Sequence, residues 1–343
     1  KFMIDIIFKK FIRILIILSV ITLSGYLIKQ YFNYSLYEYR VAKDEVVVIP
    51  KGYSGKKIAA LLLEREIIND ARVFVLWTKI KKYNDSEYLI AGEYKINKGM
   101  NMLQIVDKML AGDIIVYKLT IPEGALTIEA VNIIINSPRV INDLDGKSEF
   151  KAQGVILPET YFYTYGAKAS ELLEKCAKNL NKFIDYAWNQ RDPLINNIIN
   201  NKQEAMILAS IVEREAKLDT EKQRIAAVYF NRLKIKMPLQ ADPTVIFALT
   251  EGKTFDLKLS YDNLRFVSPY NTYMINGLPP SPICNPGKAA IEAVMHPHYT
   301  NEIYFVADGK GGHLFSSSFK DHGENIKKYR KALLKNNPIL SQE

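Results

Sequence analysis

The chain has 343 residues, 48% of them hydrophobic and 24% charged, so it is long enough for more than one folded region. Its formal net charge of +9 suits a membrane surface or an anionic polymer, but the basic residues are interleaved with acids and form no base-reading motif, so we expect no nucleic-acid partner. Cys176 and Cys284 are too few for a disulfide framework or a zinc site. Each is expected to be a small buried side chain, with a single bridge between them left open.

An apolar stretch near the N-terminus predicts a single transmembrane helix. Residues 14–28 carry no charge, and their neighbours extend the stretch to 11–29, which is roughly the 17 or more residues that a membrane span needs. Basic residues precede it, which predicts that residues 1–10 are a cytoplasmic stub and that the rest lies on the external side. No small-residue cleavage site follows, which favours a retained anchor over a signal peptide that is removed.

A small unit follows the membrane helix. Residues 30–43 are polar and rich in tyrosine, which is typical of a juxtamembrane linker. Residues 44–113 predict a strand, a helix that Ser54 caps, a break at "ND", a second helix, a second strand and a helix ending at Gly112. This order resembles a LysM-like carbohydrate-binding module, although a plain structural spacer has the same pattern.

The larger region, residues 114–337, begins with an alternating strand in "DIIVYKLTIPEG". Helical periodicity dominates residues 170–235, whereas Pro, Gly and Asn divide 240–320 into loops and short strands such as "EIYFVAD". Residues 327–335 predict a closing surface helix. The expected fold class is α+β, with a single N-terminal transmembrane helix, a small LysM-like module and a larger mixed α/β domain.

Two carboxylates stand at the end of an apolar helix in "LASIVEREAKL", residues 208–218. On a helical wheel Glu215 falls on the apolar face, whereas Glu213 falls toward the polar side. Burial against aliphatic side chains raises the pKa of a carboxyl group, which a general acid working near neutral pH requires. Glu215 is therefore the candidate acid, and the alternatives are a carboxylate paired with a buried base such as Arg232 or one that lies on a flank exposed to solvent.

Polar side chains of the kinds that bind sugar hydroxyls occur on the Pro- and Gly-rich stretches downstream, with aromatic residues beside them. The candidate substrate-binding residues are Gln240, Asp242, Thr244, Asn271 and Tyr273. Each of them alone is more typical of a loop without a binding role.

Four stretches together resemble the YceG-like family of endolytic murein transglycosylases: "LASIVEREA", "VYFNRLKIKMPLQADPTVIFAL", "YNTYMINGLPPSPICNPG" and "YFVADGKGGHLF". The resemblance covers nearly the whole chain and implies that residues 114–337 are a YceG-like catalytic domain with Glu215 as its catalytic residue. Glu213 also matches a family position, so it stays the register alternative. Gln153 and Glu159 depart from the family's pattern, which puts an essential carboxylate at 153 in doubt and leaves Glu159 a groove candidate, with a plain turn as its alternative.

The resemblance implies a lytic transglycosylase, a lyase that cleaves between N-acetylmuramic acid and N-acetylglucosamine within peptidoglycan strands and leaves a 1,6-anhydro end. One carboxyl group can act first as acid and then as base while the substrate's 6-hydroxyl attacks, so we expect no cofactor and no metal. It also implies an enzyme of the bacterial cytoplasmic (inner) membrane that terminates or trims nascent strands, with peptidoglycan as partner and peptidoglycan synthases as further candidates.

Other functions are weighed against this one. A non-catalytic, membrane-anchored scaffold that binds peptidoglycan fits the LysM-like unit and the basic charge. A metal hydrolase would need a ligand set from the chain's histidines, but His296 and His298 flank a proline and the set is not clear. Residues 307–313, "ADGKGGH", lack the spacing of a phosphate-binding loop and predict a hairpin turn.

Overall fold

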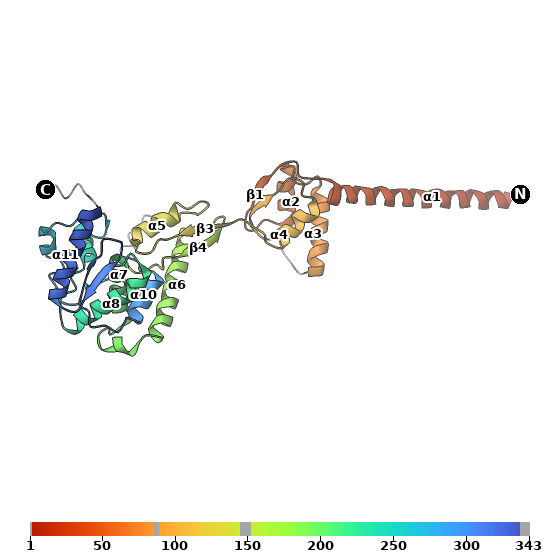
Figure 1. Cartoon of the computed structure of the whole chain (residues 1–343). Helices are drawn as coiled ribbons and strands as arrows, with labels where there is room; N and C mark the ends of the chain where they lie inside the picture. Colours follow the sequence, from red (N-terminus) through yellow and green to blue (C-terminus); the bar gives the residue numbers. More distant parts are fainter. Residues whose placement is uncertain (1, 86–88, 145–151, 337–343) are drawn as a thin grey trace. The chain divides into compact units, whose positions relative to one another are not determined.

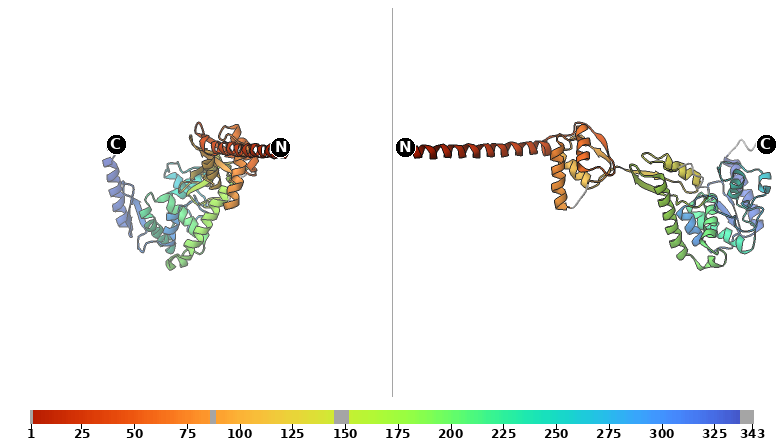
Figure 2. Two further views of the ribbon diagram at one scale, coloured as in Figure 1. Left: turned by 90° about the vertical axis from the view of Figure 1, so that its right-hand side faces the viewer. Right: turned by 180° about the vertical axis from the view of Figure 1, so that it is seen from behind.

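The computed structural model describes residues 2–85, 89–144 and 152–336, and the chain divides into two compact units. Unit 1 comprises the residues up to Tyr117 together with Tyr163–Gly166, and unit 2 comprises Lys118–Phe162 and the residues from Ala167 onward. Figures 1 and 2 show the elements of each unit in sequence colours. Each unit has its own hydrophobic core.

Unit 1 begins with a long apolar helix, α1 (Phe2–Asn33), which continues into a π-helical turn, η1 (Tyr34–Glu38). It is long and apolar enough to span a membrane, and its apolar side chains are exposed to the surroundings, as a membrane helix requires. Residues 30–43 differ from the predicted linker. They are helical through Glu38, and Leu36 and Val41 are buried in the core of unit 1 because both are apolar and pack against it.

The rest of unit 1 has the predicted order of elements. These are β1 (Glu45–Ile49), α2 (Gly55–Glu64), α3 (Ala71–Asp85), β2 (Gly92–Ile96) and α4 (Met102–Leu110). The two strands are antiparallel, with Val47 opposite Tyr94. Ser54 caps α2 by accepting from the Lys57 N–H, and a capping box of Asn101 and Gln104 begins α4. The elements are therefore confirmed, whereas carbohydrate binding by this unit stays a prediction.

A two-stranded ribbon and a helix precede the helical part of the chain. β3 (Val116–Thr120) pairs with β4 (Thr160–Thr164), and α5 (Thr127–Ile135) lies between them in sequence. The ribbon continues past β3, since the Ile121 N–H donates to the Glu159 carbonyl. Neither β4 nor α5 was predicted, because each is short and β4 directly follows the turn residues around Pro158.

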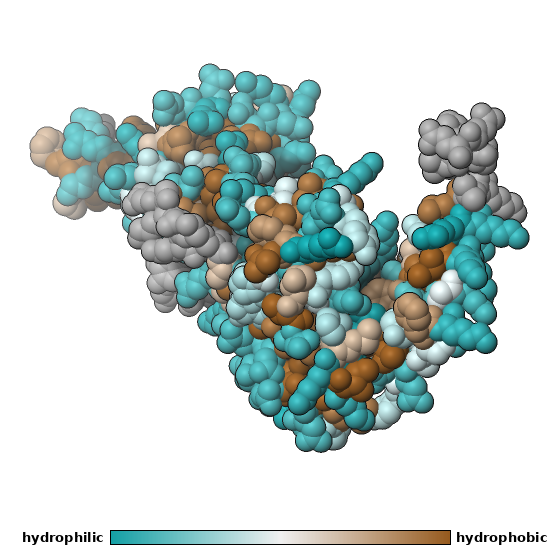
Figure 3. All heavy atoms as spheres, turned by 90° about the vertical axis from the view of Figure 1, so that its left-hand side faces the viewer, coloured by the Kyte–Doolittle hydropathy of each residue, from teal (hydrophilic) through white to brown (hydrophobic). Residues whose placement is uncertain are grey.

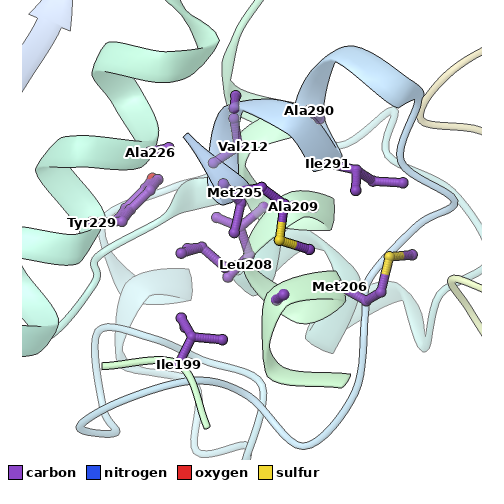
Figure 4. Close-up of a cluster of buried hydrophobic side chains, with 14 of the residues drawn as sticks. Ile199, Met206, Leu208, Ala209, Val212, Ala226, Tyr229, Ala290, Ile291 and Met295 are labelled. Carbon is purple, nitrogen blue, oxygen red and sulfur yellow. The ribbon is translucent and has the colours of Figure 1, made fainter. Parts of the chain in front are cut away.

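Unit 2 is built around an interior helix. Its remaining elements are α6 (Ala169–Asn189), η3 (Pro193–Asn197), α7 (Lys202–Glu215), α8 (Asp219–Lys234), α9 (Asp242–Thr250), η4 (Asp262–Arg265), α10 (Lys288–Met295), β5 (Tyr304–Ala307), β6 (His313–Ser316) and α11 (Phe319–Asn336). α7 packs against both α8 and α10. Figure 4 shows their side chains in one cluster, which includes Leu208, Ala209, Val212, Ala226, Tyr229, Ala290, Ile291 and Met295.

Two helices lie in the stretch predicted as loops and strands, α9 and α10. Both are short, and α9 also has a proline at its second position and no polar side, so it lacks the periodicity of an amphipathic helix.

The predicted hairpin at residues 307–313 is confirmed. β5 and β6 pair antiparallel, with Tyr304 opposite Ser316 and Ala307 opposite His313. The closing helix, α11, packs on both strands and is longer than the predicted 327–335. On the face shown in Figure 3, hydrophobic residues lie in separate groups between hydrophilic ones.

Candidate active site

The middle of α7 is buried on every side. All residues from Ala205 to Val212 are buried, including Ser210, whose hydroxyl donates to the Ile207 carbonyl and accepts from the Ile283 N–H. The prediction that one side of this helix is polar is therefore wrong. Between residues 205 and 212, α7 runs among other helices of unit 2, and a helix in that position buries its whole circumference.

Glu215 is the last residue of this buried helix. Ala216 has an extended conformation, with φ −83° and ψ 116°, so the helix ends three residues before the predicted end at 218. Carbonyl groups at a helix C-terminus carry partial negative charge, which disfavours a carboxylate at that position. The location of Glu215 thus favours the protonated carboxyl group even before its neighbours are considered.

Tyr229, on α8, holds the Glu215 carboxyl group. Its side chain is fully buried, and its hydroxyl donates to Glu215 Oε1 at 3.0 Å. Burial, followed by the negative charge of Asp242, raises the pKa of Glu215 to about 7, against the opposing effects of Tyr229 and Arg232. The Glu215 side chain is only partly buried, so it keeps access to a ligand. A carboxyl group with these properties can be protonated near neutral pH and can donate that proton.

Arg232 does not pair with Glu215 in an ion pair. Its guanidinium donates to the carbonyl groups of Ile303 at 2.7 Å and Leu239 at 2.5 Å, and it lies 5.7 Å from the centre of the Tyr304 ring. In the described part of the chain, Glu215 has no basic partner in ion-pair contact. The alternative of a simple buried ion pair is therefore wrong for Glu215.

Three predicted groove residues lie at the start of α9 and in the loop beside it. The Tyr273 hydroxyl donates to Asp242 Oδ1 at 2.7 Å, and burial together with this bond raises the pKa of Tyr273, so it remains a phenol. The negative charge of Glu215 also raises the pKa of Tyr273. Gln240 has an exposed side chain and a φ of 51°, a conformation that costs energy for a residue other than glycine and is found at functional sites.

Two other predicted groove residues are buried within the protein. Thr244 Oγ1 donates to the Ala241 carbonyl at 2.6 Å and is 2.8 Å from Thr272 Oγ1. Asn271 has no exposed surface, and its amide group donates to two backbone carbonyls of residues 264–266. Direct contact of Thr244 or Asn271 with a sugar is therefore contradicted by their burial, and both side chains hold the loops in place.

Glu159 lies at the base of the β3–β4 ribbon. It forms an ion pair with Lys288 at 2.7 Å, and both side chains are partly exposed. Gln153 is buried, and its side-chain oxygen accepts from the Thr127 N–H at 2.9 Å, so it has a structural contact there.

Glu213, the register alternative, is held by two groups. Its Oε2 accepts from the Gly287 N–H at 2.9 Å, and Lys222 Nζ lies 3.1 Å from Oε1. Only 7% of its side chain is exposed, which corrects the prediction of a polar position. Burial raises the pKa of Glu213, while Lys222 and the Gly287 N–H stabilise its carboxylate. Glu213 is therefore an ion-paired anchor, and Glu215 has the geometry of an acid.

Sequence reasoning missed Tyr229 and Lys222, the partners of the two glutamates. Both lie on α8, and only the packing of α8 against α7 brings them to Glu215 and Glu213. Cys176 and Cys284 are both buried and free. Among the described residues, no three or more His, Cys, Asp or Glu side chains gather in a way that could hold a metal ion.

Together the fold and the site define a protein of mixed helices and short sheets. It has one N-terminal helix that is long and apolar enough to span a membrane, and a partly exposed carboxyl group at the end of an interior helix. The chain belongs to the YceG-like family, whose profile matches residues 47–328. The resemblance seen in the sequence is thereby confirmed.

Relatives in the family agree with this assignment. The endolytic murein transglycosylase of Bacillus subtilis (strain 168) is 31% identical over 310 residues, which is 82% of this chain and 83% of the relative. The endolytic murein transglycosylase of Streptococcus pneumoniae (strain D39) is 26% identical over 92% of this chain, and the match spans 64% of that protein. The crystal structure of a YceG-like protein from Listeria monocytogenes is similar with a TM-score of 0.50 and 29% identity, covering 83% of this chain and 99% of that one.

Proposed function

We propose that this protein is a membrane-anchored lytic transglycosylase that cleaves peptidoglycan strands internally, between N-acetylmuramic acid and N-acetylglucosamine. The similarity to endolytic murein transglycosylases supports the substrate and the reaction. The observation that carries the proposal is Glu215, a carboxyl group at a helix end with a pKa raised to about 7 and a tyrosine hydroxyl on one oxygen.

The first step is proton donation by Glu215. Tyr229 donates to Oε1, so the proton of the neutral acid is placed on Oε2, from which it passes to the glycosidic oxygen. The bond between this oxygen and C1 of the muramic acid residue then breaks, and positive charge develops at C1. The Tyr229 hydroxyl stabilises the carboxylate that this step leaves behind.

The second step uses the same group as a base. The Glu215 carboxylate takes the proton of the 6-hydroxyl of the muramic acid residue, and that oxygen attacks C1 to close the 1,6-anhydro ring. The substrate supplies its own nucleophile at high effective concentration, so no second carboxylate is needed to activate water. Glu215 ends protonated, as it began.

Asp242 and Tyr273 influence the charged groups that form during this reaction, which are the Glu215 carboxylate and the positive charge at C1. The negative charge of Asp242 raises the pKa of Glu215 and so helps to keep it protonated, and it can stabilise the positive charge at C1. Tyr273 orients Asp242 through its hydroxyl. Gln240, exposed and strained, is proposed to bind sugar directly together with Glu159, whereas Thr244 and Asn271 position the loops.

The location follows from the same proposal. α1 anchors the protein in the bacterial cytoplasmic membrane, basic residues before the apolar stretch hold its N-terminus in the cytoplasm, and residues 114–337 act as the catalytic domain on the external side. Residues 44–113 bind glycan as a LysM-like module. An anchored enzyme of this kind meets strands as they leave the membrane, so we propose that it terminates or trims nascent strands near the synthases.

Mass spectrometry of digested sacculi tests the proposal. The whole chain in detergent is compared with Glu215→Gln and with Glu174→Gln, a matched change at an exposed position of α6. We expect anhydro-muropeptides from the parent and from Glu174→Gln. We expect none from Glu215→Gln. Products with reducing ends would identify a hydrolase instead, and binding of sacculi without any product would identify a scaffold.

A further inference from the structure

A buried lysine lies at the other side of the α7 end, and the mechanism above does not use it. Lys222 is 2% exposed, yet three carboxylates surround its ammonium group. Its Nζ lies 2.8 Å from Asp219, 3.1 Å from Glu213 and 3.5 Å from Glu123. Burial alone lowers the pKa of a lysine, but the bonds to Asp219 and Glu213 outweigh it and raise the pKa of Lys222, so it stays charged.

Three other segments of unit 2 contact the end of α7 at Glu213 and next to it. Its carboxylate binds Lys222 of α8 and the N–H of Gly287, the residue before α10. Glu123 packs so closely on Gly287 that a Cβ there would lie 2.1 Å from its Oε1. The next residue of α7, Arg214, donates to the Gly124 carbonyl at 3.4 Å. The helix is therefore fixed two residues before Glu215.

Two side-chain contacts join the end of α7 to α8, Glu213 with Lys222 and Glu215 with Tyr229. Residues two apart on a helix point about 200° apart, so Glu213 and Glu215 project to different sides of α7. Their partners, Lys222 and Tyr229, are seven apart on α8, which places them on one face about two turns from each other. Both contacts depend on how the end of α7 packs against α8, since each joins a residue of α7 to a residue of α8.

We infer that Lys222 and Glu213 are a positioning pair that keeps Tyr229 on the Glu215 carboxyl group. The inference rests on the proposed role of Glu215, because the pair acts on the reaction only through that group. The ion pair itself is buried, so removal of one partner leaves an unpaired charge that forces the α7 end or α8 to shift. A shift of about 1 Å at an acid costs up to about 100-fold in rate.

The effect on rate is measured with the whole chain in detergent. Lys222→Met is expected to lower kcat about 10- to 100-fold with little change in KM, and Lys222→Arg to restore most of it, because the guanidinium keeps the charge. Lys202→Met is the control, since Lys202 pairs with a carboxylate on the surface at the start of α7. The inference would be overturned by an unchanged kcat in Lys222→Met. It would also be overturned if Lys202→Met lost as much rate as Lys222→Met.

A double-mutant cycle tests whether Lys222 acts through Tyr229. If it does, Lys222→Met has little further effect on kcat in a Tyr229→Phe background, whereas independent, multiplied losses would contradict the pairing. If Lys222→Met does not fold, the neutral double variant Glu213→Gln with Lys222→Met replaces it, because both buried charges are then removed together.

Titration of Glu215 separates this inference from the proposed function. Glutamate side chains are labelled for NMR, and the signal of Glu215 is assigned because it is missing in Glu215→Gln. The pKa of Glu215 is then measured without an activity assay. Loss of the Tyr229 bond removes an effect that lowers the pKa, so the pKa of Glu215 should rise in Lys222→Met. An unchanged titration overturns the positioning role, whereas full activity of Glu215→Gln overturns only the proposed function.

Discussion

The Tyr229 hydroxyl donates to Glu215 Oε1 at 3.0 Å, and Tyr229 itself has no exposed surface. Burial raises the pKa of Tyr229 far above its ordinary value, so the hydroxyl remains a donor at every physiological pH. A permanent donor on one oxygen leaves the other oxygen as the place where the proton of Glu215 is gained and lost. This contact has measurable consequences for the pH dependence of the reaction.

Tyr229→Phe should move the alkaline limb of the activity profile to higher pH. The hydrogen bond stabilises the carboxylate and lowers the pKa of Glu215, so its removal raises that pKa and keeps the acid protonated further into the alkaline range. The maximal rate should fall by about 10- to 100-fold, as far as in Lys222→Met, because the bond that orients the acid is lost. The measurement is kcat/KM for strand cleavage between pH 5 and 9, and a limb that moves to lower pH would contradict it.

Asp242→Asn should shift the same limb in the opposite direction. The charge of Asp242 raises the pKa of Glu215, so a neutral amide lets the acid ionise at lower pH. The same pH series measures this, with Asp256→Asn at an exposed loop position as the control. Equal limbs in the parent and in Asp242→Asn would show that the two carboxyl groups do not interact.

Glu215→Gln should be more stable than the parent at alkaline pH. The pKa of Glu215 is raised from 4.5 to about 7 in the folded protein, so the folded state binds more protons than the unfolded state between these values. The stability of the parent therefore falls as pH rises through this window, and glutamine does not titrate. The gain should be on the order of 1–3 kcal/mol at pH 8 and vanish below about pH 4.5. Thermal unfolding at both pH values measures it, and a gain that grows on acidification would be the wrong sign.

Asn285→Ala should destabilise unit 2 strongly. Its fully buried side chain accepts from the N–H groups of Val155 and Ile156 at 3.0 Å each and donates to two oxygens of residues 125–127. Removal of this amide takes a partner from two backbone N–H groups, one backbone carbonyl and one threonine hydroxyl, at a cost of about 3 kcal/mol or more. Denaturant unfolding compares it with Asn301→Ala at an exposed position, and equal midpoints would contradict the expectation.

Truncation should show that residues 30–43 contribute to the core of unit 1. A chain that begins at residue 44 lacks Leu36 and Val41, which are buried in the core of unit 1, and loses the bond from the Gly99 N–H to the Val41 carbonyl. A chain that begins at residue 30 keeps all of them. The shorter chain should be less stable by about 2–5 kcal/mol in unit 1, read by hydrogen exchange of β1 and β2. Equal protection would place residues 30–43 outside the folded unit.

The sequence by itself determined the features that depend on nearby residues. The length and apolar content of residues 11–29 predict a membrane helix, because a span is a local property of composition. The βααβ order of residues 44–113 and the cap at Ser54 follow from periodicity and capping chemistry, which also act within a few residues. A carboxylate among aliphatic neighbours made Glu215 the candidate acid for the same reason.

The tertiary structure alone decided which groups meet. The helical wheel placed Glu213 toward solvent, but α8 and the segment before α10 cover that side of α7. Tyr229 and Lys222 contact the two glutamates only because α8 packs on α7. Thr244 is buried, so its side chain does not face a ligand. Contacts of this kind join residues far apart in sequence, and their geometry depends on the packing of the whole unit, whereas periodicity records only the local preference of each segment.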